Sequence, residues 1–177
     1  MQRRTWICSI LMVFSMFLAM GCSKTSGEGG KEATHAHDDG SGHGPHDGVL
    51  APLSGGAGHA EIKLHDDKGD LEVWLAEDPK ITRPIDLPLD TTVSITFKDK
   101  GGKVAALKVR NTKHNEDEDG TPNIREGKTN YFIYPGEGGE SSEWLMGKDF
   151  RSKATLTVTS GGKTLTTEEF ELTPHHH

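Results

Sequence analysis

The stretch GHAEIKLHDDKGDLEVWLA, residues 58–76, has the pattern of two β-strands joined by a tight turn. Its first half alternates apolar Ala60, Ile62 and Leu64 with polar residues, and its second half restarts the alternation at Leu71. A period of two places successive side chains on opposite faces of a strand, so each half is expected to bury one face. The stretch therefore predicts an antiparallel β-hairpin.

Similar alternating patterns recur further along the chain. They predict two more hairpins, over 93–109 and 154–172, a short strand at 131–134 and one helical turn within 141–148. About seven short strands with almost no helix favour an all-β fold, an antiparallel immunoglobulin-like β-sandwich. A small open β-barrel is the alternative. The Cys-Trp-Cys signature of true immunoglobulin domains is absent, so only the architecture is predicted.

The N-terminus has the parts of a secretory signal, namely two arginines, an apolar run over 6–20 and small residues before Cys22. The run is shorter than the roughly 20 apolar residues of a membrane span. The segment resembles a bacterial lipoprotein signal peptide, and AMGC at 19–22 fits the lipobox. This resemblance implies cleavage before Cys22, lipidation of its thiol and, because Ser23 is not acidic, an outer-membrane position facing the periplasm. An ordinary signal peptide with a chance cysteine is the alternative.

A linker is expected between this anchor and the β-domain. The segment is rich in Gly, Ser, His and Asp, so it cannot bury enough apolar surface to offset its chain entropy. Only VLAPL at 49–53 interrupts this composition, as a candidate first strand docked on the domain edge. The predicted organisation is a signal peptide (1–21), a lipid-anchored flexible linker (22–57), a β-sandwich domain (58–173) and a histidine tail (174–177), native or left by an affinity tag.

Composition excludes several classes of function. The formal net charge is -7, and removal of the signal takes away Arg3 and Arg4 but no acid, so nucleic-acid partners are not expected. Cys8 leaves with the signal and Cys22 carries the lipid, which excludes thiol catalysis and thiolate metal sites in the mature chain. No nucleophile elbow, His-Glu-x-x-His motif or phosphate loop is present, so an enzyme is not expected.

Histidine and carboxylate residues at the start of the β-domain predict a metal site. Neutral imidazole is a good ligand for Zn, Cu and Ni, and carboxylates can complete such a site. His59 and Glu61 lie on one strand face, with Cα atoms about 7 Å apart. The glycine-rich segment before them lets His46 fold back over that face, and His43 or water would be the fourth ligand.

The linker offers further ligands in the spacing His35-x-His37, which could wrap one ion. The alternative is a polar spacer in which histidine is one more soluble residue. His65 lies at the hairpin turn beside Asp66 and Asp67, and we expect it to be solvated rather than a ligand.

Four short motifs carry a family resemblance: HGPHDG at 43–48, HAE at 59–61, HDD at 65–67 and GGK at 161–163. Their order resembles an uncharacterised family of His-rich, planctomycete-type bacterial lipoproteins with a C-terminal β-sandwich domain, although Asp47 stands where that family often has glycine. The first two motifs are also similar to N-terminal parts of periplasmic adaptors of heavy-metal efflux pumps. The first resemblance implies the architecture, and the second points towards metal.

The acidic loop at 115–126 has the spacing of an EF-hand calcium loop, with glycine at its sixth position. A solvated acidic loop without an ion is the alternative, because acidic stretches match this spacing easily. The candidate calcium ligands are Asn115, Asp117, Asp119, Asn123 and Glu126.

Two functions remain open. The first is a lipid-anchored protein that binds a transition metal in the cell envelope for buffering or hand-over. The second is a non-enzymatic interaction module for an envelope protein or glycan, with the histidine-rich linker as a spacer. The second function predicts an exposed aromatic patch, formed by Trp74, Tyr131, Tyr134 and Trp144.

Overall fold

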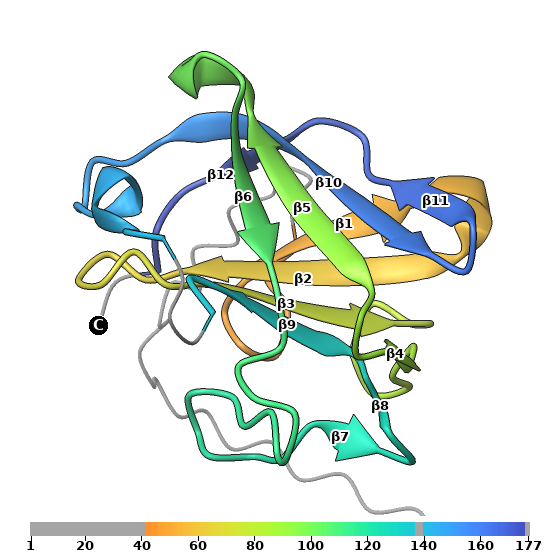
Figure 1. Cartoon of the computed structure of the whole chain (residues 1–177). Helices are drawn as coiled ribbons and strands as arrows, with labels where there is room; N and C mark the ends of the chain where they lie inside the picture. The colour runs from red at the N-terminus through yellow and green to blue at the C-terminus, as the bar shows by residue number, and fades with distance from the viewer. Residues whose placement is uncertain (1–41, 137–139, 176–177) are drawn as a thin grey trace, which may run out of the picture. The chain divides into compact units, whose positions relative to one another are not determined.

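The computed structural model describes residues 42–136 and 140–175 (Figure 1). Within them, the hairpin expected at 58–76 is formed by β2 (Gly58–Leu64) and β3 (Leu71–Ala76). The two strands pair antiparallel, with Leu64 opposite Leu71 and Ile62 opposite Val73. Alternation of apolar and polar residues therefore sets the register, as the sequence predicts.

Two further strands complete the first sheet, in the order β1-β2-β3-β9. β1 (Val49–Leu53) pairs with β2 and β9 (Tyr131–Tyr134) pairs with β3, both antiparallel. The 3-10 turn η1 (Ser54–Gly56) joins β1 to β2. The end of the expected linker is therefore folded, because its apolar residues 49–53 gain a strand partner.

The second sheet contains the other two predicted hairpins. Its order is β11-β10-β5-β6, and β12 also pairs with β10. All these pairings are antiparallel and the sheets are not closed into a barrel, which confirms the β-sandwich. The strands are β5 (Thr92–Phe97), β6 (Lys103–Leu107), β10 (Ser152–Ser160), β11 (Lys163–Thr166) and β12 (Phe170–Leu172).

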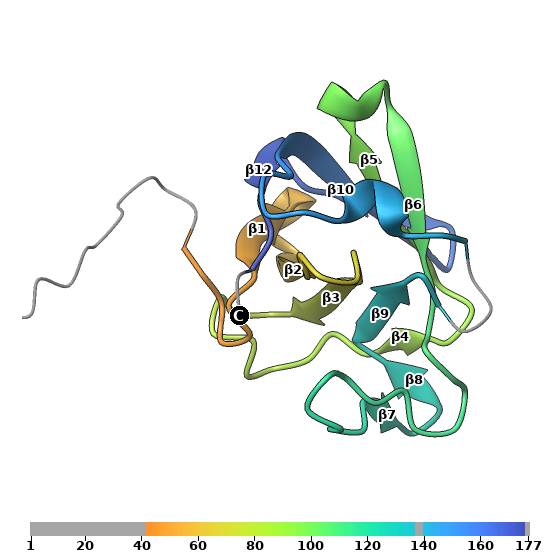
Figure 2. The ribbon, with the colours of Figure 1, turned by 90° about the vertical axis from the view of Figure 1, so that its left-hand side faces the viewer.

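Short strands and 3-10 turns lie in the connections between the main strands of this sandwich. A small sheet in the order β4-β8-β7 lies outside the strands that the sequence predicts. Figure 2 shows the first sheet between the second sheet and the segment that carries β7 and β8. In the described residues, no helix is long and apolar enough to cross a membrane. The short elements are β4 (Leu87–Pro88), β7 (Ile124–Arg125), β8 (Lys128–Thr129), η2 (Lys98–Lys100) and η3 (Glu143–Leu145), the last within the predicted helical turn.

The main core fills the space between the two sheets, where Ile62, Val73, Ile95 and Leu156 are fully buried. The opposite face of the first sheet is covered as well. Glu61 is 0 % exposed there, and Trp74 and Tyr131 form a separate small cluster. A sandwich face normally contacts water, so polar residues buried on this outer face need partners. These partners define the candidate site.

Candidate metal centre

Two segments cover the outer face of the first sheet. Before β1, the turn at 43–48 folds back over β2, as its glycines predict. Gly48 lies so close to β2 that an added Cβ would be 2.7 Å from the carbonyl oxygen of Ile62. From the other side, the loop after β6 brings Asn115 and Glu118 over the same face.

Glu61 fixes the first of these segments. Its Oε1 accepts hydrogen bonds from the backbone amides of His46 at 2.8 Å and Gly48 at 3.0 Å. Its Oε2 lies 2.7 Å from Nδ1 of His46, whose ring stacks on Trp74 at a centroid distance of 4.1 Å. Burial opposes protonation of His46, but the hydrogen bond and charge of Glu61, aided by Asp117, raise its pKa overall. The pair therefore holds the turn against the sheet.

The other residues of the expected site do not complete it. The structure brings His46 to Glu61, but the ligand atoms of His46, Glu61 and His59 do not form a group that could hold one ion. Nδ1 of His59 is buried without a hydrogen-bond partner among the described residues. His43 pairs its backbone with Val49 and lines a pocket instead. Cys22, His35 and His37 lie outside the described residues.

A different group brings imidazole and carboxylates together. Nε2 of His65 lies 2.9 Å from Oε2 of Glu72 and 3.3 Å from Oε2 of Glu118. The three ligand atoms lie within 4.8 Å of one another, and within 42–136 and 140–175 no other such group of three is found. Loop residue Glu118 covers His65, so the expectation that His65 is solvated was wrong; His65 is 7 % exposed.

Each member of this group comes from a different part of the fold. His65 follows the end of β2, and Glu72 lies on β3 opposite Lys63 in the hairpin register. Both are therefore placed by the sheet. Glu118 comes from the long loop and has a side chain that is 29 % exposed. The group is thus built on a rigid hairpin and closed by a loop.

Neighbouring side chains satisfy the two carboxylates. Glu118 forms an ion pair with Nζ of Lys63 through Oε1. Oε1 of Glu72 accepts a hydrogen bond from the hydroxyl of Tyr131 and lies 3.6 Å from Nη2 of Arg110. Burial and the charge of Glu72 raise the pKa of Tyr131, so its hydroxyl stays protonated and donates.

The charges around His65 favour its protonated form. Its hydrogen bond to Glu72 raises its pKa, and the charges of Glu72 and Glu118 add to this effect against burial and Lys63. One imidazole and two carboxylates form a ligand set that suits a divalent transition metal. The cluster of His65, Glu72 and Glu118 could therefore hold a metal ion, which would replace a proton on His65.

Three of the expected calcium ligands, Asn115, Asp117 and Asn123, form hydrogen bonds within the protein. Asn115 is 0 % exposed; its Oδ1 accepts from the backbone amide of Arg110, and its Nδ2 donates to Tyr131 O and Thr129 Oγ1, each at 2.8 Å. Asp117 accepts hydrogen bonds from Thr121 N and Asn123 Nδ2. Asp119 and Glu126 are exposed and form no three-acid group with Asp117. The hydrogen bonds of Asn115 hold the loop on the sheet, and those of Asp117 lie within the loop.

The aromatic patch expected for an interaction module is not exposed. Trp74, Tyr131 and Tyr134 are buried, and Trp144 is partly buried against Phe97. Of the large apolar side chains in the described residues, Val104 on β6 and Met146 just after η3 are exposed. These aromatics therefore serve packing.

The chain was compared with protein-family models, with curated proteins and with solved structures. None of these comparisons found a match. The chemistry of the buried polar groups is therefore the guide to function.

Proposed function

We propose that this protein is a lipid-anchored, metal-binding protein of the cell envelope. It binds a transition-metal ion, Zn, Cu or Ni, at His65, Glu72 and Glu118 and buffers it or hands it to another protein. The single observation that carries the proposal is the convergence of these three ligand atoms within 4.8 Å. The lipoprotein-like signal at 1–22 supports the envelope location.

The construction of the site suits an exchangeable ion. Two ligands lie on the hairpin, so their positions change little on binding. The third, Glu118, lies on a loop whose motion can admit and release the ion. Water completes the coordination shell, which is the open arrangement of sites that exchange their metal.

Affinity is limited by the partners that the carboxylates already have. The ion must displace the Lys63 ammonium from Glu118 and a proton from His65. Both exchanges oppose binding, because each breaks a favourable interaction inside a partly buried site. We therefore expect dissociation constants of about micromolar rather than the much tighter values of structural zinc sites.

A titration with Zn, Cu and Ni tests the proposal. The full chain is purified in detergent with His35, His37, His176 and His177 replaced by alanine, which removes the linker and tail imidazoles that lie outside the described residues. His65→Ala and Glu118→Gln should each weaken binding at least tenfold. His114→Ala and Glu116→Gln are matched controls, because both residues are exposed on the same loop.

Two results would contradict the proposal. One is loss of affinity in the controls that equals the loss in His65→Ala and Glu118→Gln. The other is dependence on His59 and His46 but not on His65, which would return the site to the residues first expected from the sequence. Thermal unfolding of each variant without metal checks that the fold is intact.

A further inference from the structure

Lys63 connects the candidate metal centre to a neighbouring pocket. Its ammonium pairs with Glu118, and its side chain also lines a cavity of about 390 Å³ beside β2. The turn before β1 closes one side of this cavity. The C-terminal residues 173–175 close the other side, where the amide of His175 donates to the carbonyl of Leu64 at 2.7 Å.

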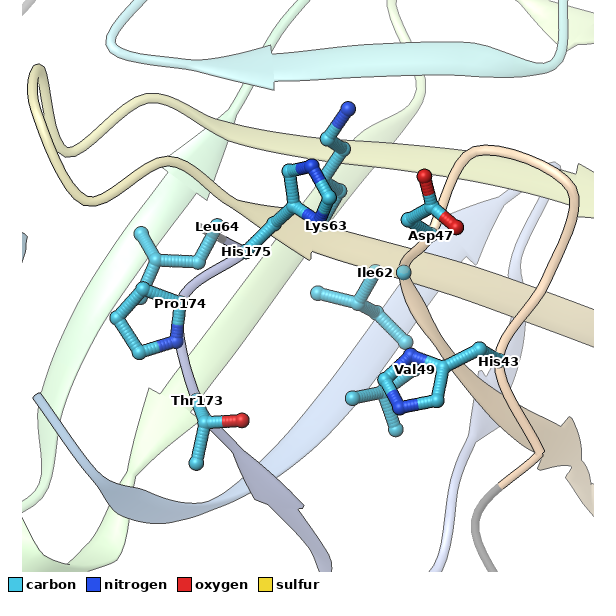
Figure 3. Close-up of a pocket in the computed structure, with 10 residues that line it drawn as sticks. His43, Asp47, Val49, Ile62, Lys63, Leu64, Thr173, Pro174 and His175 are labelled. Atoms are coloured by element: carbon cyan, nitrogen blue, oxygen red, sulfur yellow. The ribbon is translucent and has the colours of Figure 1, made fainter. Parts of the chain in front are cut away.

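The pocket contains an acid that Lys63 could pair with. Figure 3 shows the side chains of Asp47 and Lys63 along its upper side, with His43 and Thr173 lower down. Asp47 is exposed, and among the described residues that line this pocket it is the acidic one. The other nearby carboxylates are engaged: Glu61 holds the turn, and Asp117 holds Asn123 and Thr121.

Metal binding would leave Lys63 without its counter-ion. Lys63 is 5 % exposed, and a buried ammonium without a paired anion is strongly unfavourable. A divalent ion on Glu118 would also repel the ammonium at short range. The four-carbon stem of lysine allows its charged end to move without a change in the strand.

We propose that Lys63 occupies the metal site in the metal-free protein and moves to Asp47 when the ion binds. This inference rests on the proposed metal site. Lys63 is then a built-in competitor that satisfies Glu118 until an ion displaces it. Asp47 is a positioning residue, which raises metal affinity without contacting the metal because it receives the displaced ammonium.

A double-mutant cycle with Zn as the only added metal tests this coupling in the same full-chain background. Lys63→Met should bind Zn at least tenfold more tightly than the parent, because the competitor is gone. Asp47→Asn should weaken Zn binding about threefold to tenfold where Lys63 is present and should have no effect in the Lys63→Met background. Asparagine tolerates the left-handed conformation of Asp47, whose φ is 61°. Asp67→Asn, at an exposed acid on the β2–β3 turn, is the charge control and should change nothing.

Each outcome of this cycle either supports or overturns the proposed coupling of Lys63 and Asp47. An effect of Asp47→Asn that is equal with and without Lys63 would show a general charge effect and overturn the inference, as would unchanged or weaker binding by Lys63→Met. If Lys63→Met fails to fold, Lys63→Gln replaces it with the same expectation. The proposed function fails separately, through absence of His65-dependent Zn binding in the parent protein.

Discussion

Replacing Glu61 by glutamine should loosen the turn that covers the outer face of the first sheet, with the larger effect at low pH. Glu61 is fully buried and receives two backbone amide hydrogen bonds and one from His46. The Glu61→Gln change keeps the size of the side chain but removes its charge. It therefore isolates the electrostatic part of this contact.

The magnitude follows from the hydrogen bonds and from the pKa of His46. That pKa is raised above its usual value of 6.5, so the stabilisation from the charged pair is fully present below pH 6.5 and is lost as pH rises through the folded-state value. At pH 9 the introduced amide can still bond to neutral imidazole, and we expect a loss of about 1–2 kcal/mol. At pH 5.5 the parent also has the charged pair of Glu61 and His46, which the amide cannot form, and we expect a loss of about 3–4 kcal/mol.

Denaturant unfolding followed by circular dichroism measures this difference at both pH values. A loss of about 3–4 kcal/mol corresponds to a fall of roughly 10–15 °C in melting temperature for a domain of this size. Glu171→Gln is the matched control, because Glu171 is exposed and pairs only at the surface with Arg151. Control and parent should have similar stability. A destabilisation by Glu61→Gln that is equal at both pH values, or smaller at pH 5.5, would refute the assigned role of the His46 pair.

Three further outcomes are expected. Zn affinity should fall about tenfold per pH unit below the raised pKa of His65, so the decline begins above pH 6.5; competition titrations from pH 8 to 6 that show constant affinity would exclude His65 as a ligand. Asn115→Ala should destabilise the fold by about 2–4 kcal/mol in denaturant unfolding, because it leaves the buried partners of the amide unpaired. Millimolar calcium should not raise the melting temperature of the parent protein; a rise that Asp117→Ala abolishes would restore the calcium loop. Cys22→Ser should release the protein from the membrane fraction; retention of unprocessed protein there would mean that lipidation is not the anchor.

The sequence predicts the sandwich well because several of its strands, β2 and β5 above all, have an apolar residue at every second position. Ile62 and Ile95 are each flanked by polar residues, and both face the core. The sequence allows residues 43–48 to fold back over β2, but what holds them there was harder to foresee. They are polar and glycine-rich, and what orders them is Glu61, an acid that alternation places on the presumed solvent face.

Only part of the candidate site could have been predicted from the sequence. Glu72 could have been found, because the hairpin register places it opposite Lys63 and diagonal to His65. Glu118 could not have been found in this way, because it lies 42 positions after Ala76, the end of the hairpin (118 minus 76). The geometry of its loop is set by buried hydrogen bonds such as those of Asn115. His65 was assigned to solvent for the same reason.

The cover on both faces of the first sheet has a consequence for backbone opening. The β2–β3 hairpin has an apolar core on one side and the polar layer with its loops on the other, and strands flank it at both edges. Water can reach its amides only when one of these layers separates. Amide hydrogens of Ile62 and Val73 should therefore exchange only through global unfolding. Those of β6, at a sheet edge where Val104 is 49 % exposed, should exchange through local fluctuations and much faster.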